Sequence, residues 1–401
     1  MSSVNTLNFE QSANLLAALH QQATGEAALT ATDLSTFISQ AQHILASGYD
    51  NVMNSISQVV GRTIISVRSY NRKFPNLEVS NDKWGGIVRK IQFLDDNPED
   101  SQVYALTDGY SIDHYKVKKP KALETVFVGA DIWSDHYTTF RDQLTDAFSG
   151  PAEFGSFMAG VITHFSNMFE QRLEEFDRAA VCNFIAGKNA IATADSDGSV
   201  IHLLTEYNTL LGLADDDAFT EETIRLPANW GPFCKWMYGR VAEITELMTE
   251  RSELFQKKLT DVRLMRHSPL QDQKLFMLSE FLNSMRAEVL ADTYHESFLT
   301  YSDVQAVNYW QSIKSPAAVD VTPSYIDSAG EVVEGLDSSE QDLDNVIGVI
   351  FDRDAIAVNI YEDNVYTTPF NAAGEYYNTF RNTKIRYAND FTEKGVVLIL
   401  D

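Results

Sequence analysis

The longest regular pattern in the 401-residue sequence is Pro151–Gly187, PAEFGSFMAGVITHFSNMFEQRLEEFDRAAVCNFIAG. Its large apolar residues recur at intervals of three and four, as on one face of an α-helix; they are Phe154, Phe157, Met158, Val161, Ile162, Phe165, Met168, Phe169, Leu173, Phe176 and Phe184. Proline is tolerated in the first turn of a helix, and glycine often stands just past its end. The pattern therefore predicts one helix over 152–186, which at 1.5 Å per residue forms a rod of about 50 Å.

The outer face of this predicted helix carries the charged residues Glu170, Arg172, Glu174, Glu175, Asp177 and Arg178. Glu170 and Glu174 are one turn apart and share a face, but no histidine accompanies them as in the di-iron helical bundles. We therefore expect this face to be solvated.

The first 60 residues are polar and contain two short amphipathic patterns. One runs from Phe9 to Leu19, and the other runs from an Asp33 cap to a Gly48 stop. Short helices depend on packing against other structure. We therefore expect these residues to form an arm that needs a partner surface.

Residues 62–121 combine strand signals with local positive charge. The run 62–70 alternates and is rich in β-branched residues, which predicts a strand. Eleven basic and eight acidic residues lie in 62–121, so this segment carries +3 and the remainder carries −29. One interpretation is a solvated hairpin whose charges have no role; the other is a β-projection that meets an acidic surface on another copy of the chain. The residues predicted to make these inter-subunit contacts are Arg68, Arg72, Lys73, Lys83, Arg89, Lys90, Lys116, Lys118 and Lys119.

The remaining sequence predicts a mixture of helices and strands. The predicted elements are a turn at 195–198, a strand at 199–204, a long helix after Pro227, a buried strand at 274–282, and two strand pairs, 346–350 with 355–361 and 383–388 with 396–400. The stretch Asp320–Asp344 holds eight acidic residues and no Lys or Arg. Its composition predicts a loop.

The composition argues against several classes of function. A formal charge of −26 disfavours a protein whose main role is to bind nucleic acid, because phosphate binding needs a basic face. No apolar run approaches the ~20 residues that span a bilayer, and the opening residues MSSVNTLNFE lack the features of a secretory signal. Cys182 and Cys234 are 52 positions apart, too far for a zinc or redox motif. We expect both to be small buried residues in a reducing cytoplasm.

Recognised catalytic motifs are missing from the sequence, which has no phosphate-binding glycine loop, nucleophile elbow or H-E-x-x-H. Asp131, Asp135 and His136 remain as candidates for a metal site or an acid–base pair, and a loop with a capped helix start is the alternative. Asp195 and Asp197 resemble half of a calcium loop, although a turn explains them better. A cytoplasmic, acidic, metal-dependent enzyme is therefore one hypothesis. The main prediction is a protein that is not an enzyme and has no catalytic, cofactor or metal residues.

Two C-terminal stretches carry a family resemblance. Val346–Val358, VIGVIFDRDAIAV, resembles the central strand pair of the major capsid protein of tailed bacteriophages, which has the Hong Kong 97-type α+β fold. Tyr376–Phe391, YYNTFRNTKIRYANDF, with Gly395–Leu400, GVVLIL, resembles the returning strands of that family and the capsid proteins of small short-tailed phages. The order of the predicted elements along the whole chain is similar as well.

The resemblance implies a division of the chain into five parts. They are an N-terminal arm (1–60), an extended β-hairpin loop (61–128), a peripheral domain (129–200) with its spine helix at 152–186, an axial domain (201–375), and strands that return to the peripheral domain (376–401).

The resemblance also implies a structural capsid protein of the virion. Hexamers and pentamers of the chain would form an icosahedral shell around packaged double-stranded DNA. A portal and a separate scaffolding protein would assist assembly in the host bacterial cytoplasm, without a membrane. An encapsulin-type bacterial nanocompartment has the same fold and is the alternative. For the capsid protein, we expect reversal of Arg72, Lys73, Arg89 and Lys90 to Glu to leave the subunit folded and to block assembly of the shell.

Overall fold

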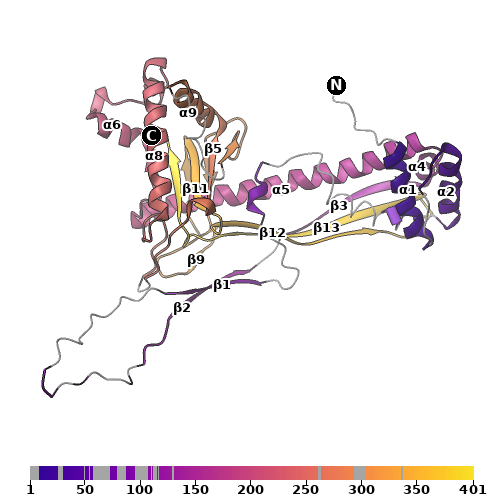
Figure 1. Ribbon diagram of the computed structural model, residues 1–401, viewed down its shortest axis with the longest axis horizontal. Helices are drawn as coiled ribbons and strands as arrows, with labels where there is room; N and C mark the ends of the chain where they lie inside the picture. Colours follow the sequence, from indigo (N-terminus) through magenta and orange to yellow (C-terminus); the bar gives the residue numbers. More distant parts are fainter. Residues whose placement is uncertain are drawn as a thin grey trace.

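The computed structural model shows an elongated α+β molecule in which one long helix joins two groups of elements (Figure 1). It describes residues 9–25, 30–48, 50–53, 55–56, 73–78, 87–94, 107–109, 111, 115, 117–128, 131–260, 263–292, 304–335 and 337–401. The strand predicted at 62–70 lies outside these residues. None of the described helices is long and apolar enough to cross a membrane.

The joining helix is α5 (Pro151–Asp195), whose 45 residues span about 67 Å at 1.5 Å per residue. Its N-terminal half packs in the same core as the N-terminal helices, and its C-terminal half packs against a five-stranded sheet (Figure 1). The predicted helix is confirmed over 152–186. The predicted end at Gly187 is wrong, because α5 continues to Asp195 and ends at Ser196, which adopts a left-handed conformation with φ of 52°.

Gly187 is buried inside α5 because the ring of Phe391 lies against its backbone. A Cβ atom at position 187 would lie 2.5 Å from Cε1 and Cζ of Phe391. That ring stacks on Phe184, with centroids 5.5 Å and planes 9° apart, so it has little room to move away. Glycine at 187 therefore permits close packing and does not end the helix.

Gly187→Ala is expected to lower the free energy of unfolding by about 1–3 kcal/mol, because overpacking outweighs the gain in helix propensity. Gly160 in the same helix is the matched control, since it is exposed and a Cβ there would meet nothing within 4 Å. Gly160→Ala is expected to raise stability by about 0.5–1 kcal/mol. Urea denaturation of the isolated subunit measures both changes. Similar shifts for the two variants would contradict the packing role of Gly187.

The charged face of α5 is only partly solvated, which corrects the prediction. Arg172 and Glu175 form an exposed ion pair at 2.6 Å. Glu170, Glu174 and Asp177 are buried, and Glu174 Oε1 accepts a hydrogen bond from Arg178 Nη2 at 2.6 Å. Arg178 in turn contacts the ring of Phe74 and donates to Tyr309 O, so segments distant in the sequence cover this part of the helix.

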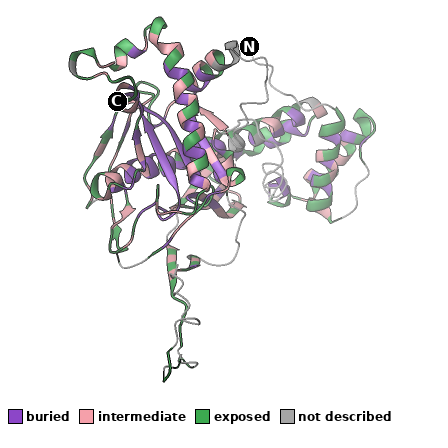
Figure 2. Cartoon of the chain, turned by 60° about the vertical axis from the view of Figure 1, so that its left-hand side comes forward, coloured by how far each residue is buried: buried purple, intermediate pink, exposed green. Residues whose placement is uncertain are grey.

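The five-stranded sheet forms the centre of the first group of elements, in the order β4-β14-β11-β5-β6. Its strands are β4 (Val200–His202), β5 (Gln273–Leu278), β6 (Val304–Val307), β11 (Val346–Asp352) and β14 (Gly395–Ile399). β11 runs antiparallel to β14 and β5, whereas the outer pairs β14–β4 and β5–β6 are parallel. Every residue of β11 and β14 is buried (Figure 2), as expected for strands covered on both faces.

A three-stranded antiparallel sheet, in the order β12-β13-β3, runs alongside α5. Its strands are β3 (Asp131–Phe140), β12 (Ile356–Thr367) and β13 (Tyr376–Asn389). The two predicted pairings of C-terminal strands are therefore wrong: β11 pairs with β14, and β12 pairs with β13. A tight turn, in which Ala355 N donates to Asp352 O at 2.9 Å, sends the chain from one sheet to the other.

Helices pack with the five-stranded sheet in the same core. They are α6 (Leu203–Leu211), α7 (Glu221–Ile224), α8 (Pro227–Thr249) and α9 (Ser279–Asp292). α8 confirms the helix predicted after Pro227. The strands predicted at 199–204 and 274–282 are shorter than expected, because the chain enters α6 at Leu203 and α9 at Ser279.

The acidic stretch predicted as a loop contains short strands. They are β7 (Val319–Val321), β8 (Tyr325–Ile326), β9 (Val332–Val333) and β10 (Gln341–Leu343). β7 pairs with β10, and β8 pairs with β9. The prediction of a loop is therefore correct for the connections and wrong for these short segments.

The second group of elements has a core of its own. The helices α1 (Phe9–Thr24), α2 (Leu34–Ala46) and α4 (Arg141–Ala147) pack against the N-terminal half of α5. Asp33 caps α2 by accepting a hydrogen bond from Thr36 N at 2.8 Å. The two predicted helices are confirmed. The expected partner surface lies within the same chain, because α5 packs against these helices.

Candidate functional site at the root of the β1–β2 ribbon

A two-stranded ribbon, β1 (Ile87–Phe93) and β2 (Ala122–Val128), leaves the body below β9 in the view of Figure 1. The strands are antiparallel, with Lys90 opposite Thr125 and Arg89 opposite Val126. Successive side chains of a strand point to opposite faces. Arg89 and Lys90 therefore lie on different faces of the ribbon, and they have different surroundings.

The outer face of the ribbon is apolar and exposed. Ile91 and Phe93 are 65% and 72% exposed, and Val126 on β2 is 45% exposed. Arg89 and Glu124 pair across this face at 3.5 Å, and both side chains are well exposed. Such a surface pair adds at most about 1 kcal/mol. Large apolar side chains gathered on one exposed face are typical of a surface that contacts another protein.

The inner face of the ribbon is tied to the body by Lys90. Its Nζ donates to Asp390 Oδ2 at 2.8 Å and also contacts Glu393 Oε1. Arg266 Nη2 reaches the same Glu393 oxygen at 3.1 Å. Asp390 and Glu393 are buried in the loop between β13 and β14. We call these four residues the root cluster.

Burial and ion pairing have opposite effects on the pKa values of the root cluster. Burial by itself would lower the pKa of Lys90, but the charges of Asp390 and Glu393 outweigh it, and the pKa is raised. Burial raises the pKa of Glu393 against the opposing charges of Lys90 and Arg266. Removing one partner of a buried ion pair costs about 3–5 kcal/mol, because the remaining charge loses its compensation. The root cluster therefore opposes detachment of the ribbon from the body.

A second lysine lies under the same loop and is fully buried. Nζ of Lys188 donates to three carbonyl oxygens, those of Phe255 at 2.9 Å, Glu393 at 3.2 Å and Phe391 at 3.5 Å. Burial lowers the pKa of Lys188 to about 8, and nearby acids, Asp197 foremost, counter it in part. The β13–β14 loop is thus held by the ribbon through Lys90 and by α5 through Lys188.

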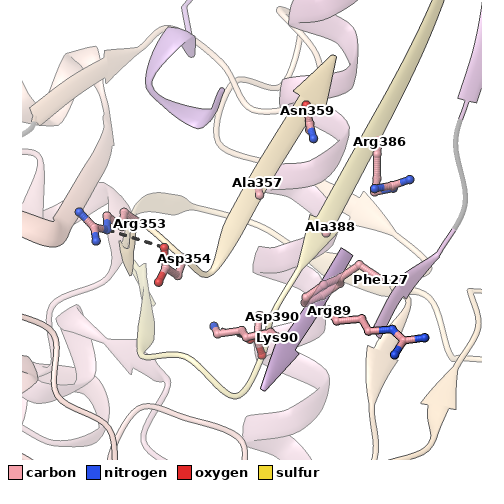
Figure 3. Close-up of a pocket in the computed structure, with 10 residues that line it drawn as sticks. All are labelled: Arg89, Lys90, Phe127, Arg353, Asp354, Ala357, Asn359, Arg386, Ala388 and Asp390. Carbon is pink, nitrogen blue, oxygen red and sulfur yellow. Dashed lines mark hydrogen bonds and ion pairs between the residues drawn. The ribbon is translucent and has the colours of Figure 1, made fainter. Parts of the chain in front are cut away.

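A cleft of about 290 Å³ lies beside the root cluster, between the ribbon and the β12–β13 pair (Figure 3). Four of its lining residues are basic and two are acidic. The lining consists of Arg89, Lys90, Phe127, Arg353, Asp354, Ala357, Asn359, Arg386, Ala388 and Asp390.

Of the residues predicted as inter-subunit contacts, those that the structure describes have different surroundings. The structure describes Lys73, Arg89, Lys90, Lys118 and Lys119, and it places Arg89, Lys118 and Lys119 among the exposed residues. Lys90 belongs to the root cluster inside the chain. The other predicted contacts, Arg68, Arg72, Lys83 and Lys116, lie outside the described residues.

The candidate metal or acid–base residues do not converge. Asp131, Asp135 and His136 lie on β3 and not in a loop before a helix, which corrects the alternative prediction. The two aspartates share one face of the strand. His136 faces the opposite side, where its ring stacks on Phe380 with centroids 5.4 Å apart. Within the described ranges, no group of three or more His, Cys, Asp or Glu is placed to hold a metal ion.

The remaining polar and thiol candidates have roles inside the chain. Asp197 accepts hydrogen bonds from Ser199 N at 2.9 Å and Ser199 Oγ at 2.6 Å, which confirms the predicted turn. Asp195 pairs with Lys257. Cys182 and Cys234 are free and buried as predicted, and burial raises the pKa of each thiol to about 12.

Comparison with known proteins identifies the family of this chain. Residues 16–398 match the family model of the Phi29-like phage major capsid protein. The chain belongs to this family. This capsid protein is therefore a structural protein of a tailed-phage head, where copies of it build the shell of the virion. No curated protein matches the sequence significantly.

Solved structures show the same fold at low sequence identity. A chain in the capsid structure of Staphylococcus phage Andhra is 11% identical, with 84% of this chain and 86% of that chain covered and a TM-score of 0.53. A chain in the head fiber and inner core structure of native bacteriophage P68 is 10% identical, with 82% and 85% covered and a TM-score of 0.52. The predicted Hong Kong 97-type α+β fold is confirmed.

Sequence reasoning missed the partners of the ribbon root. Lys90 and Asp390 are 300 positions apart, and neither stands in a recognisable motif. A weak signal was present in Asp390–Lys394, DFTEK, where charged residues follow a buried strand and precede the apolar run of β14. Lys188 carried a similar signal, since it lies inside an apolar helical pattern.

Proposed function

We propose that this capsid protein forms hexamers and pentamers of an icosahedral shell around double-stranded DNA, and that the outer face of the β1–β2 ribbon contacts a neighbouring subunit. The exposed apolar row of Ile91, Phe93 and Val126 carries the proposal. Burying one large apolar side chain contributes about 1.5–3 kcal/mol. A contact with another copy would realise this free energy, which the single subunit leaves unused.

The distribution of charge also favours contact between copies of this chain. Arg89, Lys118, Lys119 and Lys121 are exposed along the ribbon and the stretch before β2, whereas the chain outside 62–121 carries −29. A basic projection on an acidic body attracts the bodies of other copies and disfavours contact between two projections. Salt at high concentration should therefore slow assembly.

Phe93→Asp is expected to leave the subunit folded and to raise the critical concentration for assembly roughly tenfold, which corresponds to a loss of about 1.4 kcal/mol per contact. Ile313→Asp is the matched control, because Ile313 is 74% exposed and belongs to the connection between β6 and β7. Light scattering and sedimentation measure assembly, and circular dichroism measures folding. Unchanged assembly of Phe93→Asp would remove the ribbon face from the interface.

The remaining parts of the proposal follow from the family. We propose that a portal and a separate scaffolding protein take part, that assembly occurs in the host bacterial cytoplasm, and that the protein has no catalytic activity. We also propose that α5 is the spine of a peripheral domain and that 201–375 form an axial domain. Electron microscopy of the expressed protein, with and without scaffolding protein, tests the shell. A protein that stays monomeric in every salt and scaffold condition would overturn it.

A further inference from the structure

Two histidines connect the N-terminal helices. His20 lies one turn before the end of α1, His43 lies in the last turn of α2, and the two helices pack side by side (Figure 1). Nε2 of His20 lies 3.1 Å from Nδ1 of His43. The ring centroids are 5.2 Å apart and the ring planes are inclined by 26°. Because the centroids are much farther apart than the two nitrogens, the rings meet through their nitrogen edges and not face to face.

A hydroxyl group assigns the tautomer of His20. Thr24 Oγ1 donates to the backbone oxygen of His20 at 2.7 Å, so its hydrogen is committed there. The same Oγ1 lies 3.4 Å from Nδ1 of His20 and can accept a hydrogen from it. When Nδ1 of a neutral imidazole carries the hydrogen, Nε2 presents a lone pair. In His20 this lone pair is directed at His43, which supplies the hydrogen between the two rings.

The geometry of the pair matches that of two histidines on one metal ion. Metal-ligating histidines donate their other ring N–H to an oxygen, as His20 does to Thr24. Two imidazole nitrogens that lie about 2.1 Å from a tetrahedral metal ion are about 3.4 Å from each other. A small separation of the rings would therefore admit an ion. His20 is 8% exposed and His43 is exposed, so the pair is anchored in the protein and open to solvent.

The ligand chemistry of the pair selects transition metals. Imidazole nitrogen suits zinc, copper and nickel, whereas magnesium and calcium prefer oxygen ligands. Among the described residues, no group of three or more His, Cys, Asp or Glu is placed to hold a metal ion. Water would therefore fill the coordination positions that the two histidines leave open.

We propose that His20 and His43 bind one divalent transition-metal ion, which joins α1 to α2. The ion takes the lone pairs of Nε2 of His20 and Nδ1 of His43. The hydrogen on Nδ1 of His43 moves to Nε2 of the same ring by exchange with solvent, so the neutral pair loses no proton. This site goes beyond the shell function. It belongs to the single subunit, where the ion would tie the two N-terminal helices together.

Zinc titration of the isolated subunit tests the site. Calorimetry in excess magnesium, which occupies the carboxylates of this acidic chain, is expected to show a saturable site for one zinc ion per chain. His43→Gln is expected to lower its affinity at least tenfold, a loss typical even of residues that only orient a ligand. His267→Gln is the matched control, because His267 is also exposed, and it is expected to bind zinc as the wild type does. The absence of a saturable site, or equal affinity of His43→Gln and wild type, would overturn the proposal.

Nuclear magnetic resonance of the histidine rings identifies the ligand atoms. With nitrogen-15 in the rings, zinc is expected to shift the signals of Nε2 of His20 and Nδ1 of His43 with one common midpoint. The single variants His20→Gln and His43→Gln assign these signals, and circular dichroism checks that both variants fold. Zinc-dependent shifts confined to other histidines would overturn the proposal. None of these outcomes bears on the shell function, because the measurements use unassembled subunits.

Discussion

Lys90→Glu is expected to lower the free energy of unfolding of the isolated subunit by about 3–5 kcal/mol, which is typical of breaking a buried ion pair. The new carboxylate would lie against Asp390 and Glu393, both of which are buried. Glu393 would keep its ion pair with Arg266, but Asp390 would lose its pairing with Lys90. Urea denaturation followed by circular dichroism measures the loss.

Arg89→Glu is the matched control for this prediction. Arg89 is the next residue on the same strand, it undergoes the same change of charge, and its side chain is 65% exposed. Its stability is expected to change by less than about 1 kcal/mol. If the two variants lost equal stability, the root cluster would not hold the ribbon. Lys90→Met separates the two parts of the effect, because it removes the cation without adding an acid.

Lys90 and Arg89 are adjacent in the sequence but have different surroundings, so the positive charge of 62–121 cannot be assigned to one role. The charge count of 62–121 treats Lys90 and Arg89 alike, and it predicts that reversal of Arg72, Lys73, Arg89 and Lys90 leaves the subunit folded. The structure gives Lys90 an intramolecular role, so a variant that includes it would lose stability as well as assembly. A test of inter-subunit charge should therefore change the exposed residues Arg89, Lys118 and Lys119 alone.

Local patterns predicted the elements well because helix and strand periodicity is a local property. The apolar spacing in 152–186 identified the long helix, and the Asp33 cap identified the start of α2. Burial of Cys182 and Cys234 also followed from residue type. The family resemblance was confirmed by the match of residues 16–398 to the family model.

Strand pairing and burial depend on residues that are distant in the sequence, so local patterns did not predict them. The short turn after β11 suggested that β11 and β12 form a hairpin. In the structure β11 instead lies between β14 and β5 within the five-stranded sheet, and both strands are far from it in the sequence. Glu170 and Glu174 looked solvated because one helical face was already apolar. They are buried, and Arg178, which pairs with Glu174, contacts Phe74 and Tyr309, which no spacing within the helix reveals.

The stability of the subunit is expected to rise by about 2 kcal/mol between about pH 7 and about pH 9.5 through Lys188. Burial lowers the folded-state pKa of Lys188 to about 8, from an ordinary value of 10.5. Between these values the unfolded chain binds the proton and the folded chain releases it. Stability therefore increases with pH across this window, since the folded state no longer holds a buried ammonium group.

Lys188→Met isolates this contribution, because methionine fills a similar volume and does not titrate. The difference in unfolding free energy between wild type and variant should grow in favour of the wild type as pH rises toward about 9.5. Lys394, whose pKa burial also lowers to about 8, titrates in the same window, but it does so in both proteins and cancels in the difference. Parallel pH profiles for the two proteins would show that Lys188 stays charged when the chain is folded. The three carbonyls around Nζ would then form a true ammonium site that holds the β13–β14 loop, and with it the ribbon root, independently of pH.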